Sequence, residues 1–455
     1  MLITALDSRA KLHGRTSRDR GEIQMATSRR SFIQWTGTAG VTLASSAVRA
    51  GTRDDVVVAL IGCGSQGRGV AKSMAAVPGV RIAYVCDPDA ERLKAARTEL
   101  GAGEPVADLR RILDDRAVDA VIVATPDHWH APASILACDA GKHVYVEKPC
   151  SHNLREARLL LEAARRNRVV VQHGTQSRSN PLIVNAVRLL REGAIGDVLV
   201  AKAWNIQRRK NIGHQRPSQP PPGVDYDLWV GPAPMLPFQE NRFHYNWRWW
   251  HAFGNGDIGN DGTHEIDYAR WGLGVDALPT TAMGLGGKYG IDDDQQFPDT
   301  ATLAFEYPGD GGVGKRRQLI FEMRLWSGNY PHNCDSGAEF YGTNGQLFVS
   351  KRGKVELLDG SNQRVAVKPP ADLPPMPSHQ ADFVAAIRGG TRPLADMEEA
   401  YRTVALVHLG NLAVELGRSL QLEAGGDRVV GDDEATRLLG GTYRDGHWAA
   451  PRSPS

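Results

Sequence analysis

The sequence predicts an α/β protein in which an N-terminal doubly wound parallel sheet is followed by an α/β domain with an open, predominantly antiparallel sheet. Its 455 residues exceed the size of one ordinary domain. Apolar strands alternate with helical segments from residue 55 to residue 147, as in parallel sheets covered on both faces. Short strands separated by turns fill residues 278–358, which favours an antiparallel second sheet.

The composition is that of a globular chain whose partner is a small molecule. Hydrophobic residues make up 41% and charged residues 23%, and no run of about 18 apolar residues could span a bilayer. The formal net charge is +2, so no basic surface for nucleic acid is expected. The 5 cysteines form no C-x-x-C pair, which argues against a disulfide framework or a zinc finger.

The first fifty residues resemble an export signal. Arg29 and Arg30 precede a weakly hydrophobic run over residues 35–47. This pattern is similar to a twin-arginine signal, so we expect residues 1–50 to engage the twin-arginine export machinery and the mature protein to be periplasmic. Met25 is an alternative start of the chain, and a disordered basic segment is the alternative to a signal.

A glycine-rich turn follows the first buried strand, residues 56–61. The turn reads Gly62-Cys63-Gly64-Ser65-Gln66-Gly67. Its first glycine permits a tight turn, its second lets the backbone approach a diphosphate, and its third allows the next helix to pack closely. The helix N-terminus at Ser65 and Gln66 offers free N–H groups to phosphate oxygens. This turn is typical of a dinucleotide-binding Rossmann fold.

A carboxylate after the second strand indicates which dinucleotide binds. The strand over residues 81–86 leads directly into Asp87, at the spacing from the glycine turn where a carboxylate accepts hydrogen bonds from the adenine-ribose hydroxyls. The same charge would repel a 2′-phosphate. We therefore expect NAD as cofactor, with NADP disfavoured.

Two further motifs fall where strands of the first sheet end. We expect a helix over residues 90–99, a strand over 119–125, a helix over 131–140 and a strand over 143–147. Pro126-Asp127-His128-Trp129-His130 follows the first of these two strands, and Glu147-Lys148-Pro149 ends the second. Ligands of doubly wound sheets bind at the carboxyl ends of the strands. Both motifs are therefore expected in the binding cleft.

In this order the motifs resemble the Gfo/Idh/MocA family of oxidoreductases, from about Asp55 to Tyr443, and the Glu-Lys-Pro motif is the most specific element. The resemblance implies a Rossmann domain over residues 54–175, a substrate-binding domain over 176–443 and a tail over 444–455. It also implies hydride transfer between a nicotinamide cofactor and a sugar or polyol hydroxyl. The cofactor-binding residues that it implies here are Thr125, Pro126, His130, Glu147 and Lys148.

Lys148 is the first candidate catalytic residue. The resemblance implies that it contacts the nicotinamide ribose and the reacting hydroxyl. A partly buried ammonium favours alkoxide character in the transition state and can share its proton, which suits this role.

A second catalytic cluster is expected in the glycine-rich and aromatic-rich segment over residues 246–267. In the family a helix at this place carries a D-x-x-x-H pair, and aligning His264 with that histidine puts Asn260 where aspartate is usual. An amide can orient a hydroxyl but cannot take its proton. We therefore expect His264 to be the general base, with Asp267 one helical turn away as its orienting group.

Aromatic and polar side chains are expected to bind the substrate, because indole faces stack on sugar rings. The candidates are Trp129, Gln176, Trp204, Trp247, Arg248 and His264. Carboxylates and imidazole also ligate divalent ions, so a metal site formed by Asp257, Asp261, His264 and Asp267 is the alternative. The family works without metal, and no metal is predicted.

The rest of the chain is expected to complete the second domain. Strands are predicted over residues 196–204, 300–305, 317–325, 339–341 and 346–349, and helices over 182–191, 378–387 and 397–416. The last two helices are expected to pack back on the Rossmann domain. The resemblance implies subunit pairing through the second sheet, and hence a homo-oligomer.

Three functions remain in competition. The favoured one is an oxidoreductase that passes hydride between a sugar or polyol hydroxyl and NAD. The second is a redox-neutral glycosidase that oxidises a ring hydroxyl transiently, eliminates the aglycone and reduces the ring again. The third is a non-catalytic sugar-binding or sensor protein. An exported protein has no soluble nicotinamide pool to draw on, so its cofactor is expected to stay tightly bound.

Overall fold

The computed structural model describes residues 55–367, 376–426 and 428–452. The expected export signal within residues 1–50 lies outside them. Among the described residues, no helix combines the length and the apolar character needed to cross a membrane.

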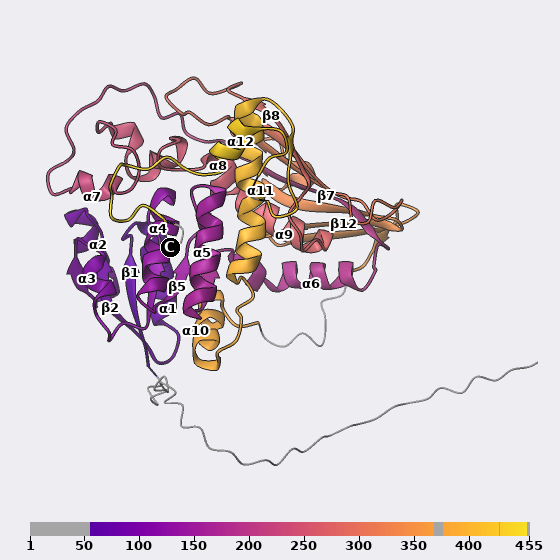
Figure 1. Cartoon of the computed structure of the whole chain (residues 1–455). Coiled ribbons are helices and arrows are strands. Elements are labelled where there is room, and N and C mark those ends of the chain that lie inside the picture. Colours follow the sequence, from indigo (N-terminus) through magenta and orange to yellow (C-terminus); the bar gives the residue numbers. More distant parts are fainter. Residues whose placement is uncertain (1–54, 368–375, 427, 453–455) are drawn as a thin grey trace, which may run out of the picture. The chain divides into compact units, whose positions relative to one another are not determined.

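The first half of the chain forms a parallel sheet in the order β3-β2-β1-β4-β5-β6 (Figure 1). All its neighbouring strands pair in parallel. Every residue of β1 is buried, as expected of a strand covered on both faces. The strands are β1 (Val56–Ile61), β2 (Val80–Cys86), β3 (Glu104–Val106), β4 (Ala120–Val123), β5 (His143–Val146) and β6 (Val171–His173).

Helices cover both faces of this sheet. Val58 and Leu60 of β1 belong to a core with side chains of α1, α2 and α10, whereas Ala59 and Ile61 face a core with α3, α4 and α5. This alternation confirms the doubly wound Rossmann fold. The helices are α1 (Ser65–Ala75), α2 (Ala90–Leu100), α3 (Arg110–Leu113), α4 (Asp127–Asp139), α5 (Leu154–Asn167) and α10 (His379–Gly389).

The second half of the chain forms a larger sheet in the order β14-β13-β12-β11-β7-β10-β9-β8-β15. Its pairs are antiparallel except β7 with β10, so the predominantly antiparallel sheet is confirmed. The strands are β7 (Val198–Ile206), β8 (Thr281–Gly287), β9 (Thr300–Tyr307), β10 (Arg317–Arg324), β11 (Ser336–Gly342), β12 (Gly345–Ser350), β13 (Lys354–Asp359), β14 (Arg364–Val365) and β15 (Leu420–Gln421).

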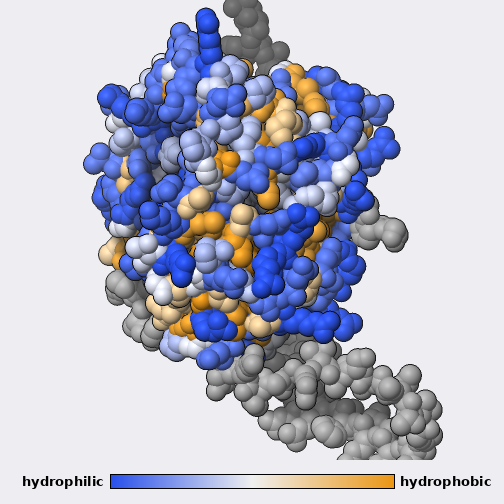
Figure 2. All heavy atoms as spheres, turned by 90° about the vertical axis from the view of Figure 1, so that its left-hand side faces the viewer, coloured by the Kyte–Doolittle hydropathy of each residue, from blue (hydrophilic) through white to orange (hydrophobic). Residues whose placement is uncertain are grey.

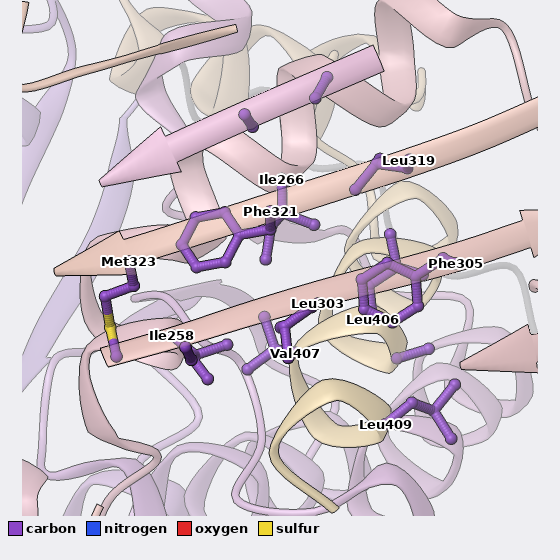
Figure 3. Packing of buried hydrophobic residues seen from close by; sticks show 14 of the residues in the cluster. Ile258, Ile266, Leu303, Phe305, Leu319, Phe321, Met323, Leu406, Val407 and Leu409 are labelled. Carbon is purple, nitrogen blue, oxygen red and sulfur yellow. The ribbon is translucent and has the colours of Figure 1, made fainter. Parts of the chain in front are cut away.

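One face of the larger sheet is covered by α6 (Pro181–Arg191), α9 (Gly262–Leu273) and α11 (Met397–Leu416). Leu303, Phe305 and Phe321 from the strands are buried against Ile266 of α9 and Leu406 of α11 (Figure 3). Burying aliphatic and aromatic side chains of this size contributes about 1.5–3 kcal/mol each. This core fixes α9, and the residues at its N-terminus, to the sheet.

The C-terminal part of the chain joins the two halves. Met397 and Val404 at the start of α11 belong to the core of the Rossmann half, whereas Leu406 and Leu409 belong to the core of the larger sheet. After α12 (Asp433–Leu438) the chain returns to the Rossmann half beside α4 (Figure 1). The expectation of a tail from residue 444 is therefore wrong: Ala449 is buried in the Rossmann core.

The surface that carries α2, α3 and α7 (Tyr226–Val230) is mostly hydrophilic and is interrupted by hydrophobic patches (Figure 2). This pattern is ordinary for a globular protein, whose surface always retains apolar atoms.

Candidate active site

The glycine turn has the shape that a dinucleotide requires. Gly62 lies at φ 95°, and a Cβ there would lie 2.5 Å from the backbone of Ala124. A Cβ on Gly67 would clash with the carbonyl oxygen of Gly62. Gly64 is the N-cap of α1 and no side chain caps the helix, so the first-turn N–H groups remain free for phosphate oxygens. The turn therefore fits a diphosphate.

Asp87 lines a pocket beside this turn, at the carboxyl end of β2. Its two oxygens accept hydrogen bonds from the backbone N–H of Cys63 at 2.8 Å and of Asp89 at 3.0 Å. These bonds fix the orientation of the carboxylate in the pocket wall, and burial raises its pKa. Arg92 lines the same pocket, 4.0 Å from Asp89. The pocket is thus placed to receive the adenosine half of NAD.

Replacing Asp87 with serine is expected to weaken the preference for NAD over NADP by about tenfold or more, because a carboxylate near a phosphate costs one or more kcal/mol. Arg92 would remain to attract the 2′-phosphate. Dissociation constants for both cofactors, measured by titration of intrinsic fluorescence, test this. An unchanged ratio of the two constants would show that Asp87 does not reach the ribose.

The ring nitrogens of His130 face backbone carbonyl oxygens, so the side chain has a structural role and does not bind the cofactor through its ring. Its Nδ1 lies 2.6 Å from the carbonyl oxygen of Pro149 and its Nε2 lies 2.8 Å from that of Thr125. The side chain is 1% exposed, and burial lowers its pKa to about 4. A neutral imidazole has one N–H, so His130 donates to one of these two carbonyl oxygens and lies against the other, between the two strand-end motifs. Thr125 and Pro126 line the pocket beside Asp87, where cofactor contact is expected.

Glu147 is held by two glutamine side chains. Its Oε1 accepts hydrogen bonds from Nε2 of Gln66 at 3.1 Å and from Nε2 of Gln176 at 3.0 Å. Gln176 also donates to the hydroxyl of Tyr145 at 2.9 Å. Gln176 was expected to bind substrate, but its amide bonds mainly position Glu147. Glu147 in turn fixes the backbone that carries Lys148.

Lys148 of the Rossmann half contacts Asn260 of the second half. Its Nζ donates to the backbone oxygen of Asn260 at 2.5 Å and to Oδ1 of the same residue at 3.1 Å. Burial lowers the pKa of Lys148, and the carboxylates of Asp261 and Glu147 partly offset this effect. An ammonium has three N–H donors, so one remains for a substrate oxygen.

Asn260 is the hub of the cluster. Its Oδ1 also accepts a hydrogen bond from Arg248 at 2.7 Å, and its Nδ2 donates to Oδ1 of Asp257 at 2.8 Å. An aspartate here would lose that donor and place its charge against the Asp257 carboxylate. The amide is therefore the side chain that suits both neighbours.

Asp261 is a functional carboxylate that the sequence analysis considered only as a metal ligand. Its Oδ2 accepts hydrogen bonds from Gln207 and Arg209, both at 2.6 Å. Burial alone would raise its pKa, but the cations of Lys148 and Arg209 lower it below its usual value. The sequence signal that was available is the D-x-x-H spacing to His264.

His264 lies in the first turn of α9, and its Nδ1 has no hydrogen-bond partner. Burial lowers its pKa well below the ordinary imidazole value, and the ammonium groups of Lys351 and Lys148 lower it further. Asp261 acts in the opposite direction. The imidazole is therefore neutral at pH 7 and can accept a proton.

The expectation that Asn260 and His264 share one helical face is wrong. Asn260 ends α8 (Gly256–Asn260), and α9 begins after Asp261. The orienting role expected of Asp267 is also wrong. Its carboxylate pairs with Arg178 at 2.8 Å and accepts a hydrogen bond from Thr403 at 2.7 Å. Asp267 thus joins α9 to the neighbouring elements.

Two tryptophans expected to bind substrate lie elsewhere. Trp204 is 0% exposed, donates to the carbonyl oxygen of Cys334 at 2.9 Å and stacks on Phe348, so it belongs to the core. Trp129 donates to the carbonyl oxygen of Trp229 at 3.1 Å and lines the pocket beside Asp87. Both positions follow from contacts between segments far apart in the sequence.

Arg248 and Trp247 lie next to each other in the 3-10 helix η3 (His244–Trp249). The guanidinium of Arg248 lies 5.0 Å from the ring centre of Trp247 and 3.9 Å from that of Tyr245. Arg248 also donates to the Asn260 oxygen that Lys148 contacts, so this segment lies beside the Lys148 cluster. Trp247 is only partly buried, which leaves part of its surface for a substrate.

The described residues contain no group of three or more metal-ligating side chains arranged around one point. The three carboxylates of the metal alternative are paired with arginines: Asp257 and Asp261 with Arg209, and Asp267 with Arg178. The donor set therefore favours charge pairing over metal coordination.

The arrangement suits oxidation of an alcohol, in which the carbon loses a hydride and its hydroxyl oxygen loses a proton. NAD, when bound, supplies the hydride acceptor. Lys148 offers one N–H to the substrate oxygen and stabilises its developing negative charge. Neutral His264 can take the hydroxyl proton, and Asp261 keeps its negative charge beside both groups.

Comparison with known proteins identifies the family of the chain. Residues 56–175 match the Gfo/Idh/MocA oxidoreductase family with an NAD-binding Rossmann fold, and residues 201–312 and 325–449 match the C-terminal alpha/beta domain of that oxidoreductase family. The scyllo-inositol 2-dehydrogenase (NAD(+)) of Bacillus subtilis is 33% identical over 292 residues, which are 64% of this chain and 72% of that protein.

Two further similarities are partial or structural. A glycosyl hydrolase family 109 protein of Shewanella sp. (strain ANA-3) is 32% identical over 162 residues, which are 33% of this chain and 35% of that protein. The structure of levoglucosan dehydrogenase in complex with NADH and levoglucosan has a TM-score of 0.62 at 20% identity, covering 81% of this chain and 99% of the other. The chain belongs to the Gfo/Idh/MocA family of NAD-binding oxidoreductases.

Proposed function

We propose that this protein oxidises a hydroxyl group of a sugar or polyol by hydride transfer to a tightly bound NAD. The observation that carries the proposal is the meeting of the Lys148 ammonium and the Asn260 side chain at the carboxyl end of the parallel sheet, with neutral His264 close by. The similarity to an inositol dehydrogenase over most of that enzyme supports a polyhydroxylated substrate.

A redox-neutral glycosidase is the second candidate. It is favoured by the similarity to a glycosyl hydrolase family 109 protein, although that match covers only 35% of the relative. Both reactions begin with the same hydride transfer. They differ in whether a glycosidic bond is cleaved and the cofactor is returned to its starting state.

The experiment that separates them uses purified protein with its retained NAD and no added cofactor. Free sugars, polyols and nitrophenyl glycosides are tested for absorbance at the NADH maximum and for released nitrophenol. NADH formed in proportion to enzyme with a free sugar or polyol supports the oxidoreductase. Catalytic release of nitrophenol without net NADH would overturn it in favour of the glycosidase. Binding of sugars without either signal would indicate a sensor.

Export by the twin-arginine route is part of the proposal, and the Arg29-Arg30 pair before an apolar run supports it. Replacing both arginines with lysine is expected to move most of the protein from the periplasmic to the cytoplasmic fraction. Immunoblots of fractionated cells measure this. The same periplasmic fraction for the wild type and the double lysine variant would show that the arginine pair is not an export signal.

We further propose that the protein is a homo-oligomer that pairs through the outer face of the larger sheet. Met283 and Leu285 of β8 are 48% and 73% exposed, and such apolar side chains on a sheet face are typical of an interface. Light scattering of the purified protein tests this proposal, because a monomeric mass would contradict it.

A further inference from the structure

The C-terminal segment, which we define as residues 443–452, is fastened to the two halves of the protein. The Tyr443 hydroxyl donates to Oε1 of Glu156 at 2.8 Å and accepts a hydrogen bond from Asn153 at 3.1 Å. Arg444 pairs with Asp227 at 2.7 Å. Ala449 is 3% exposed. The segment therefore has a defined path across the Rossmann half.

This path brings Trp448 to the pocket that contains Asp87. The ring centres of Trp448 and Trp129 lie 5.8 Å apart, and the guanidinium of Arg110 lies 4.6 Å from the centre of Trp448. Arg110 is itself held by Asp108, another residue of the pocket wall, at 2.5 Å. Trp448 is thus positioned between an aromatic ring and a cation.

The pocket lined by Trp448, Trp129 and Asp108 suits a flat aromatic base. Its lining includes the apolar side chains of Ile61, Pro88, Leu109 and Pro126. Indole rings and guanidinium groups stack on base faces without requiring a particular hydrogen-bond pattern. Trp448 is 37% exposed, so it covers the pocket from the solvent side.

We propose that Trp448, supported by Arg110, forms the outer wall of the adenosine pocket, and that the C-terminal segment thereby retains NAD between catalytic cycles. This inference rests on the proposed function only in taking NAD as the cofactor. The expected consequence is slow release of the cofactor. The contacts come from a segment that resembled a tail in the sequence.

The test measures NAD content and the rate of NADH release in the purified full-length protein and in Trp448→Ala. Removing one stacking ring is expected to accelerate release by about 10-fold or more and to lower the retained NAD. Trp326→Ala is the matched control, because Trp326 is 44% exposed and lies in the second half of the chain. Trp448→Phe is expected to restore most of the retention.

The outcomes separate this inference from the proposed function. A wild-type protein that binds NAD, together with a Trp448→Ala variant that releases it at the wild-type rate, overturns the inference and leaves the proposed function intact. A wild-type protein that binds no NAD overturns both. If Trp448→Ala does not fold, Arg110→Met carries the same test, with the same accelerated release expected.

Discussion

Replacing Lys148 with methionine is expected to reduce kcat by about 100- to 1,000-fold while the protein stays folded and keeps its NAD, because one positioned acid/base or electrostatic group is typically worth that much. Lys148 donates twice to Asn260 and has one N–H left for the substrate oxygen. Methionine has similar length but offers no donor and no charge. The transition state would then lose its stabilising cation.

The pH profile tests this role more specifically. Burial lowers the pKa of Lys148, so wild-type activity should fall at a pH below the ordinary lysine value as the ammonium loses its proton. Lys148→Met should show low activity without this basic limb. Lys315→Met, at an exposed lysine, is the control and should keep the wild-type profile. Activity of Lys148→Met within a few-fold of wild type would show that Lys148 has no catalytic role.

Replacing His264 with glutamine is expected to cost about 100-fold or more in kcat and to remove the acidic limb of the pH profile. Burial and the cations of Lys351 and Lys148 lower the pKa of His264. The imidazole is therefore neutral at pH 7, and activity should fall only when the pH drops below the ordinary imidazole value. Glutamine has no titrating nitrogen in this range.

Initial rates across the acidic range, at saturating substrate, measure this limb. His214→Gln is the control, because His214 pairs with Asp294 on an exposed surface and its loss should leave the limb in place. If the limb survives in His264→Gln, the proton acceptor lies elsewhere. Lys148, acting as a neutral amine, would then be the next candidate.

The Rossmann half could be predicted from the sequence because its signals are local. A strand buried on both faces is a continuous apolar run, and β1 has the bounds that this run predicts. The helix α11, which packs on this half, also has its predicted bounds. The glycine turn determines its own backbone conformation, and Asp87 follows the strand that carries it. These features need no knowledge of distant contacts.

The candidate site was less predictable because its residues are assembled by long-range contacts. A single helix through Asn260 and His264 was expected, but the helix is interrupted at Asp261, whose carboxylate pairs with Arg209. Asp267 forms an ion pair with Arg178, which lies far from it in the sequence. Spacing along the sequence cannot distinguish these two aspartates.

The aromatic residues show the same limit. Trp129 and Trp204 are both compatible with sugar stacking by residue type, yet one lines the adenosine pocket and the other lies in the core. Trp448 falls in a segment without periodicity, and only the return of the chain after α12 brings it to Trp129. Residue type alone therefore predicts which aromatic residues are candidates for stacking, but not where they lie in the structure.

The most direct test of the central claim follows deuterium from substrate to cofactor. The NAD-loaded protein is mixed with a panel of sugars and polyols that carry deuterium on every carbon bonded to hydroxyl. The cofactor is then extracted, and its mass is measured by mass spectrometry. We expect the cofactor to gain one deuterium in wild-type protein with at least one substrate, and to gain it about 100-fold more slowly in Lys148→Met. Oxidised product formed from a deuterated sugar or polyol while the extracted cofactor stays unlabelled would contradict hydride transfer to NAD.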